Sequence, residues 1–111
     1  SCVTYSNDIK HQWLGVSEEV LENQGAVSEP CVAQMLEGIQ KMTRSDYAIA
    51  VSGIAGPTGG TEFKPVGTVY IGVQTPFSKE VFHCHFSGPR EAVQEQSTAF
   101  AIEKMAEVLK I

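Results

Sequence analysis

The chain has 111 residues, of which 42% are hydrophobic and 19% are charged, and eight Lys and Arg against thirteen Asp and Glu give a net charge of −5. This is the composition of one globular domain and argues against disorder. The few basic residues are scattered from Lys10 to Lys110, so nucleic acid is not an expected partner. Every apolar run is far shorter than the roughly 20 residues that a membrane-spanning helix needs, so membrane insertion is not expected either.

Cysteine usage and the first residues bear on the cellular compartment. The three cysteines, Cys2, Cys31 and Cys84, are an odd number at wide spacing, which fits reduced thiols better than a disulfide framework. The first residues carry neither the basic region nor the apolar stretch of a secretion signal. We therefore expect a cytoplasmic protein.

No repeat, linker or low-complexity tract divides the sequence, so we predict a single domain over residues 1–111. Residues 2–5 are strand-like, and the short polar side chains of residues 6–8 predict a turn that opens a helix. Ser17 is the predicted N-cap of a short helix, and Gly25 is its predicted stop.

A longer helix is predicted to begin after Ser28, with its core stripe formed by Val32, Met35, Leu36, Ile39 and Met42. Residues 47–54 form a nearly continuous apolar run, the pattern of a strand buried on both faces. Residues 68–73 and 80–86 read as two further strands. The last helix is predicted to begin near Pro89, with an apolar face of Val93, Ala99, Ile102, Met105, Ala106 and Leu109. This order predicts an α/β fold in which a central sheet is covered by helices.

A glycine-rich segment is the most informative part of the chain. Residues 52–67 hold half of the ten glycines and follow directly on the predicted buried strand. A glycine-rich loop at the carboxyl end of a strand can expose successive backbone N–H groups and bind an anion such as phosphate. The segment lacks the Gly-Lys-Ser/Thr of a Walker A loop, and its Gly53-x-x-Gly56 spacing does not fit the dinucleotide fingerprint. The alternative is a wide structural turn whose glycines adopt positive φ.

A second candidate site is the predicted strand-to-helix junction at residues 5–10, which brings a phenol, a hydroxyl, an amide, a carboxylate and an amine together. A lysine partly removed from water can serve as general base to a hydroxyl nucleophile, and Lys10 is the candidate. The alternative is that Lys10 is a solvated surface amine and Asp8 a residue that favours the start of a helix.

Arg90 is a third candidate, because a cation at the start of a helix opposes the helix dipole. An arginine there could clamp a phosphate or carboxylate. The alternative is a surface arginine paired with Glu91 or Glu95.

A metal site is not expected. His83 and His85 lie on one face of a predicted strand and Cys84 on the other, and a third ligand is not evident. We therefore predict neither a metal nor another cofactor.

The sequence resembles the C-terminal domain of the CinA (competence/damage-inducible protein A) family along essentially its whole length. The resemblance is carried, in order and spacing, by Tyr5-Ser6-Asn7-Asp8-Ile9-Lys10, Leu14-Gly15-Val16, Gly25-Ala26-Val27-Ser28-Glu29, Val51-Ser52-Gly53-Ile54-Ala55-Gly56-Pro57, Gly59-Gly60-Thr61, Lys64-Pro65-Val66-Gly67-Thr68-Val69-Tyr70-Ile71-Gly72 and Phe86-x-Gly88-x-Arg90. Members of this family are nicotinamide-nucleotide amidases. The resemblance implies an α/β/α sandwich, often oligomeric, that hydrolyses the carboxamide of nicotinamide mononucleotide in pyridine-nucleotide recycling, with a serine nucleophile and a lysine base.

The resemblance also implies roles for individual residues. Lys10 would be the general base, and Tyr5 would orient the nucleophile or the substrate. Arg90 could contact the substrate phosphate. The substrate pocket would include Ser52, Gly53, Ala55, Gly56, Gly59, Gly60 and Thr68.

Two departures from the family pattern shape the functional hypotheses. The family's nucleophilic serine lies in a Ser-Cys-Thr-Gly-Gly motif upstream of the segment that corresponds to Tyr5, and this motif does not occur in the sequence. Pro89 stands where the family usually has aspartate. We therefore expect an N-terminally truncated domain that lacks the helices preceding Tyr5, and whose exposed sheet surface favours a homo-oligomer.

Three functional hypotheses follow. The chain is an amidohydrolase whose serine lies on a missing segment or on another polypeptide, or it is a non-catalytic remnant that binds a nucleotide or a protein partner. In a third hypothesis, Ser6 or Ser52 replaces the missing nucleophile.

Overall fold

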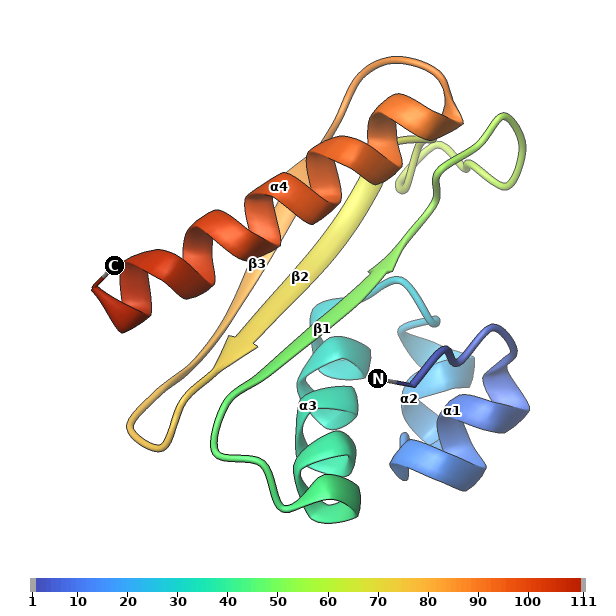
Figure 1. Cartoon of the computed structure of the whole chain (residues 1–111). Coiled ribbons are helices and arrows are strands. Elements are labelled where there is room, and N and C mark those ends of the chain that lie inside the picture. Colours follow the sequence, from blue (N-terminus) through green and yellow to red (C-terminus); the bar gives the residue numbers. More distant parts are fainter. Residues whose placement is uncertain (1, 111) are drawn as a thin grey trace.

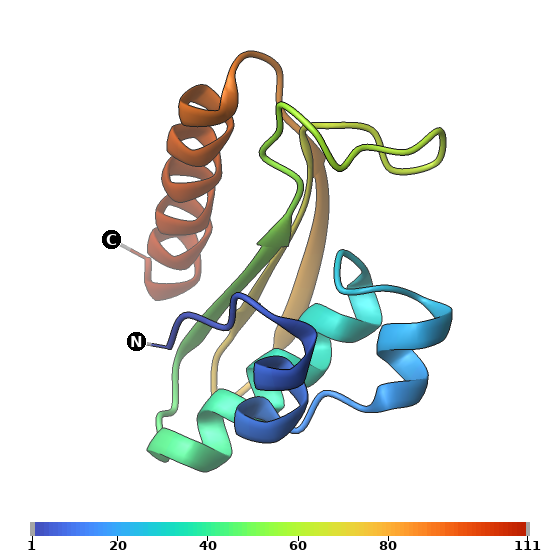
Figure 2. The same ribbon diagram turned by 90° about the vertical axis from the view of Figure 1, so that its right-hand side faces the viewer.

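The computed structural model describes residues 2–110 and shows helices on both faces of one sheet (Figures 1 and 2). On one face, a helix packs on the sheet and carries the two preceding helices on its outer side, and the long C-terminal helix lies against the other face. This layered α/β arrangement confirms the predicted fold class. The elements are α1 (Asn7–Leu14), α2 (Glu18–Asn23), α3 (Glu29–Thr43), β1 (Ala48–Gly53), β2 (Thr68–Gln74), β3 (Lys79–His85) and α4 (Arg90–Leu109). No helix within the described residues is both long and apolar enough to cross a membrane.

The sheet is antiparallel, with strand order β1-β2-β3, and its register sets which side chains share a face. Ser52 lies opposite Tyr70, and Tyr70 lies opposite His83, so these three side chains belong to the face that α3 covers. On the opposite face, Val69 and Ile71 pack against α4. Two separate clusters of buried side chains therefore stabilise the fold, one on each side of the sheet.

The prediction that the first strand is buried on both faces is wrong. In β1, buried and exposed residues alternate, and Ile49 and Val51 are 40% and 42% exposed. The reason is the position of α4, which packs mainly over β2 and leaves the outer face of the edge strand uncovered (Figure 1). The strand predicted at residues 2–5 is also wrong, because this segment forms no ladder with β1.

Helix α4 buries Val93 as predicted, but the rest of its predicted apolar face lies outside the buried core. Val93, Ser97 and Ala101, spaced four residues apart, are buried, whereas Ile102 is 61% exposed. Ser97 is tolerated in the core because its hydroxyl donates to the carbonyl of Val93 at 2.7 Å. The helix begins at Arg90, with Pro89 as its N-cap.

The predicted N-caps are confirmed. The Oγ atoms of Ser17 and Ser28 accept hydrogen bonds from the backbone N–H groups of Val20 and Cys31, at 3.1 and 3.3 Å. Ser6 caps α1 in the same way. The short helix α2 ends at Asn23, and Gly25 follows it with a φ of 84°.

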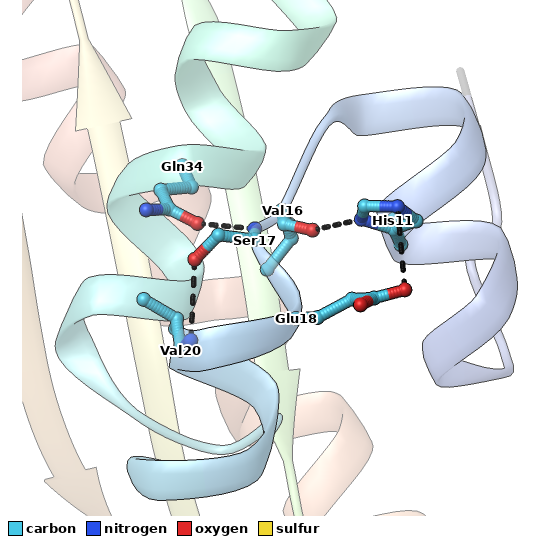
Figure 3. A network of polar contacts seen from close by, with 6 residues as sticks. All are labelled: His11, Val16, Ser17, Glu18, Val20 and Gln34. Carbon is cyan, nitrogen blue, oxygen red and sulfur yellow. Dashed lines mark hydrogen bonds and ion pairs between the residues drawn. The ribbon is translucent and has the colours of Figure 1, made fainter.

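A polar network fixes α1 and α2 to α3 (Figure 3). The side chain of Gln34 on α3 accepts from the backbone N–H of Ser17 at 2.8 Å. Nδ1 of His11 lies 2.7 Å from the carbonyl oxygen of Val16, and Nδ1 is the donor because a carbonyl can only accept. The turn between α1 and α2 is thus held from both sides.

Helices α1 and α3 cross at Gly38. A Cβ atom at this position would overlap the backbone carbonyl of Leu14, the last residue of α1. Only glycine permits this approach. Leu14, Met35 and Leu36 are buried around the crossing, and the crossing therefore determines where α1 and its side chains lie.

We predict that Gly38→Ala destabilises the protein although alanine favours helix formation. The overlap with a backbone atom should cost about 3 kcal/mol, and the helix-propensity gain should return about 1, so the free energy of unfolding in urea should fall by about 2 kcal/mol. Lys41→Ala, an exposed position on the same helix, should change it by less than about 0.5 kcal/mol. A Gly38→Ala protein as stable as the parent would contradict the close crossing.

Candidate functional site

An open cavity of about 750 Å³ runs along β1. Its walls are residues 2–5, Lys10 of α1, part of α3 and residues 49–56, and the glycine-rich loop and Arg90 close one end. The cavity unites most of the candidate residues: Tyr5, Lys10, Ser52, Gly53, Ala55, Gly56, Gly59 and Arg90. Gly60 and Thr68 lie outside it.

Lys10 is buried, with 7% of its surface exposed. Its Nζ donates to the carbonyl oxygen of Thr4 at 2.7 Å, and the side chain lines the cavity. The alternative of a solvated surface amine is therefore wrong. Asp8 is exposed in the first turn of α1, where a carboxylate complements the helix dipole.

Tyr5 and Thr4 occupy opposite environments next to this lysine. Tyr5 is 90% exposed and lies at the rim of the cavity, whereas Thr4 is 8% exposed. Because the Thr4 carbonyl holds the Lys10 ammonium, the segment that precedes α1 fixes the position of the amine. The sequence does not predict this role of Thr4, because the acceptor is a backbone carbonyl and every residue has one.

The glycines of the loop are needed for its backbone path. Gly56 and Gly59 have φ values of 88° and 96°, which residues with a Cβ atom rarely adopt. A Cβ on Gly56 would also lie 2.6 Å from Cγ1 of Val66. Two backbone hydrogen bonds of Ile54 join the start of the loop to its end. The Ile54 N–H donates to the Thr68 carbonyl at 2.9 Å, and the Ile54 carbonyl accepts from the Gly67 N–H at 2.7 Å.

Ser52 and Thr68 hold the loop through their hydroxyl groups. The Ser52 hydroxyl, on a residue 8% exposed, donates to the Ala26 carbonyl at 2.7 Å. The Thr68 hydroxyl donates to the Pro65 carbonyl at 2.7 Å. Since the Oγ of Ser6 caps α1, the hydroxyls of both Ser6 and Ser52 have structural hydrogen bonds.

Arg90 reaches the glycine-rich loop. Its Nη1 donates to the carbonyl oxygen of Gly56 at 3.0 Å, and the side chain lines the cavity. The alternative pairing with Glu91 or Glu95 is wrong, because Arg90 forms no ion pair with any carboxylate in the described part of the chain. The guanidinium has further N–H donors that remain available to a ligand in the cavity.

Part of the cavity wall is apolar. Met35 and Ile39 of α3 line it together with Ile49 of β1. Helical periodicity assigned the two α3 residues to the core, and Met35 belongs to both the core and the cavity wall. An apolar wall beside polar groups is typical of sites for small organic molecules.

The histidines and cysteines lie apart from this cavity, with the exception of Cys2. His83 stacks on Tyr70 with ring centroids 4.5 Å apart, and Cys84 packs on the α4 side, so the predicted opposite faces are confirmed. Burial raises the pKa of the Cys84 thiol, and it also raises that of Cys31, where Lys10 and Lys64 partly oppose the effect. Within residues 2–110, no three His, Cys, Asp or Glu side chains are grouped so that they could hold a metal ion.

The fold and the cavity define an α/β domain with helices on both faces of its sheet and a candidate small-molecule site along one edge strand. Residues 1–109 match the family described as the CinA C-terminal domain, and the chain belongs to this family.

Several curated relatives have functional names. The nicotinamide-nucleotide amidohydrolase PncC of Escherichia coli K12 is 50% identical over 104 residues, which are 93% of this chain and 63% of that protein. A CinA-like protein of Thermotoga neapolitana is 46% identical over 97% of this chain and 26% of its own length. The chain thus spans less than two thirds of these relatives.

Solved structures agree with the fold. The competence damage-inducible protein A of Klebsiella pneumoniae superposes with a TM-score of 0.92 at 38% identity, covering 97% of this chain and 67% of that one. The competence/damage-inducible protein of Agrobacterium tumefaciens superposes with a TM-score of 0.91 at 34% identity, covering 95% and 65%.

We predict that Ser52→Ala destabilises the protein. The substitution leaves the Ala26 carbonyl without its donor, so the free energy of unfolding in urea should fall by about 1 to 2 kcal/mol. Ser87→Ala, at an exposed position near the start of α4, should change it by less than about 0.5 kcal/mol. Equal stability of the two variants would contradict a structural role for the Ser52 hydroxyl.

Proposed function

We propose that the cavity along β1 binds nicotinamide mononucleotide and that Lys10 is the general base in hydrolysis of its carboxamide, which yields nicotinate mononucleotide and ammonia. One observation carries this proposal: the buried amine of Lys10 lines the same cavity as the glycine-rich loop and Arg90. The name of the Escherichia coli relative, a nicotinamide-nucleotide amidohydrolase, supports the substrate class.

The chemistry needs a base next to a hydroxyl nucleophile. The hydroxyl oxygen attacks the carboxamide carbon, and the base takes the hydroxyl proton and passes it to the departing nitrogen, which leaves as ammonia. Water then attacks the resulting ester and releases the carboxylic acid. Nζ of Lys10, held by the Thr4 carbonyl at 2.7 Å, is placed to carry this proton. Tyr5 at the rim would orient the nucleophile or the substrate.

The other end of the cavity suits negative charge. Backbone N–H groups of a glycine-rich loop can bind a phosphate or the oxyanion of a tetrahedral intermediate, and we assign this role to the loop from Gly53 to Gly59. Arg90 would contact the phosphate while its bond to the Gly56 carbonyl holds the loop beside it. Ser52 and Thr68 would shape the pocket through the bonds that hold the loop.

The attacking serine is assigned to a polypeptide segment outside residues 1–111. Neither Ser6 nor Ser52 is a suitable nucleophile, because the Oγ of Ser6 caps α1 and the Ser52 hydroxyl donates to Ala26. The same observation favours a second candidate function, which is binding of the nucleotide without turnover. Because the proposed hydrolysis needs a serine from outside residues 1–111, an ammonia assay on a chain joined to a serine-bearing segment distinguishes the two.

We predict that the chain alone binds nicotinamide mononucleotide and releases no ammonia. A chimera that adds the part of the Escherichia coli relative preceding the matched residues should release ammonia. In this chimera, Lys10→Met should lower kcat at least about 100-fold, because general-base catalysis contributes about that much or more.

The control for this experiment is Lys41→Met, which removes the same charge from an exposed position and should keep the activity of the parent chimera. Full activity of the Lys10→Met chimera would exclude the general-base role. A chimera that binds the nucleotide without releasing ammonia would favour the binding function instead.

A further inference from the structure

The outer limb of the glycine-rich loop, residues 57–64, projects from the body of the protein (Figure 2). Residues 57–63 are exposed, and Phe63 near the tip is 91% exposed. Lys64 is the exception, because its side chain is half-buried. Such a segment has few contacts that could hold it in one conformation.

Within residues 2–110, a single hydrogen bond joins this limb to the rest of the protein. Among the described residues, the bonds of residues 57–64 are internal to the limb, apart from the one that Nζ of Lys64 donates to the carbonyl oxygen of Gln24 at 2.6 Å. Internally, the Thr61 N–H donates to the Lys64 carbonyl and the Lys64 N–H donates to Thr61 Oγ1, at 2.8 and 3.0 Å. The Lys64 ammonium therefore anchors a turn that is already tight.

The acceptor of this bond belongs to a turn in which three successive carbonyls accept side-chain hydrogen bonds. Gln24 follows the last turn of α2, where a helix leaves carbonyl groups without intrahelical partners and favours a cation. The next two carbonyls are also occupied, Gly25 by the Ser28 hydroxyl and Ala26 by the Ser52 hydroxyl, at 2.8 and 2.7 Å. One short turn thus fixes the loop, α3 and β1 relative to one another.

We propose that Lys64 is a positioning residue, whose bond to Gln24 holds the limb that carries Thr58 and Gly59 in the conformation that lines the cavity. Lys64 does not line the cavity itself, so it acts through the loop. Arg90 holds the loop at Gly56 from the cavity side, and Lys64 holds it from the outside. The choice of nucleotide as the ligand rests on the proposed function, whereas the anchoring of the loop does not.

The test is Lys64→Met in the 111-residue chain, with Lys64→Arg as the conservative variant and Lys41→Met as the charge-matched control. Amide order parameters of Thr58 and Gly59 from ¹⁵N relaxation should be about 0.8 in the parent and fall below about 0.6 in Lys64→Met. If the binding-competent population falls to about a tenth, the Kd for nicotinamide mononucleotide in calorimetry rises about tenfold. Lys64→Arg should stay within about threefold of the parent, because arginine also donates to a carbonyl.

Each outcome decides the proposal. Unchanged order parameters in Lys64→Met would overturn it, whatever the nucleotide does. Lower order parameters with an unchanged Kd would overturn the positioning role. If the parent chain does not bind nicotinamide mononucleotide, the proposed function fails, and the order parameters alone decide whether Lys64 anchors the loop. An unchanged midpoint of urea unfolding in Lys64→Met shows that the fold is intact.

Discussion

The close crossing of α1 and α3 at Gly38 determines the geometry of the candidate site. Because Gly38 has no side chain, the carbonyl group at the end of α1 can lie directly against α3. Lys10, one turn earlier on α1, is then buried, and the carbonyl of Thr4 can hold its ammonium. A lysine on a more distant helix would be surrounded by water and would not line the cavity. The packing of two helices thus creates the chemical environment of the proposed base.

The turn between α2 and α3 has a similar role for the glycine-rich loop. The carbonyls of Gln24, Gly25 and Ala26 accept from Lys64, Ser28 and Ser52, which come from three different parts of the chain. The backbone carbonyls at and just after the end of α2 therefore position the loop and the end of β1. The site depends on hydrogen bonds to main-chain carbonyls at Thr4, Gln24 and Gly56, more than on ion pairs between side chains.

Local signals in the sequence predicted the caps Ser17 and Ser28, the three strands and the layered fold, since capping and apolar runs depend on neighbouring residues. Long-range packing decided the rest. The exposure of Ile49 and Val51 depends on where α4 lies, and the buried face of α4 depends on how it crosses the sheet. The candidate residues Lys10 and Arg90 were recognised by type and position. Their contacts could not be predicted, because Arg90 and Gly56 are 34 residues apart.

We propose that Lys10, the glycine-rich loop and Arg90 form one binding site. The most direct measurement is a titration of the ¹⁵N-labelled chain with nicotinamide mononucleotide, followed through its amide resonances. If these groups form one site, the largest shifts occur at Lys10, at the non-proline residues of 53–59 and at Arg90, with small shifts at the distant tip of the β2–β3 hairpin near Phe77. Shifts confined to other surfaces, or no shifts at saturating nucleotide, would contradict it.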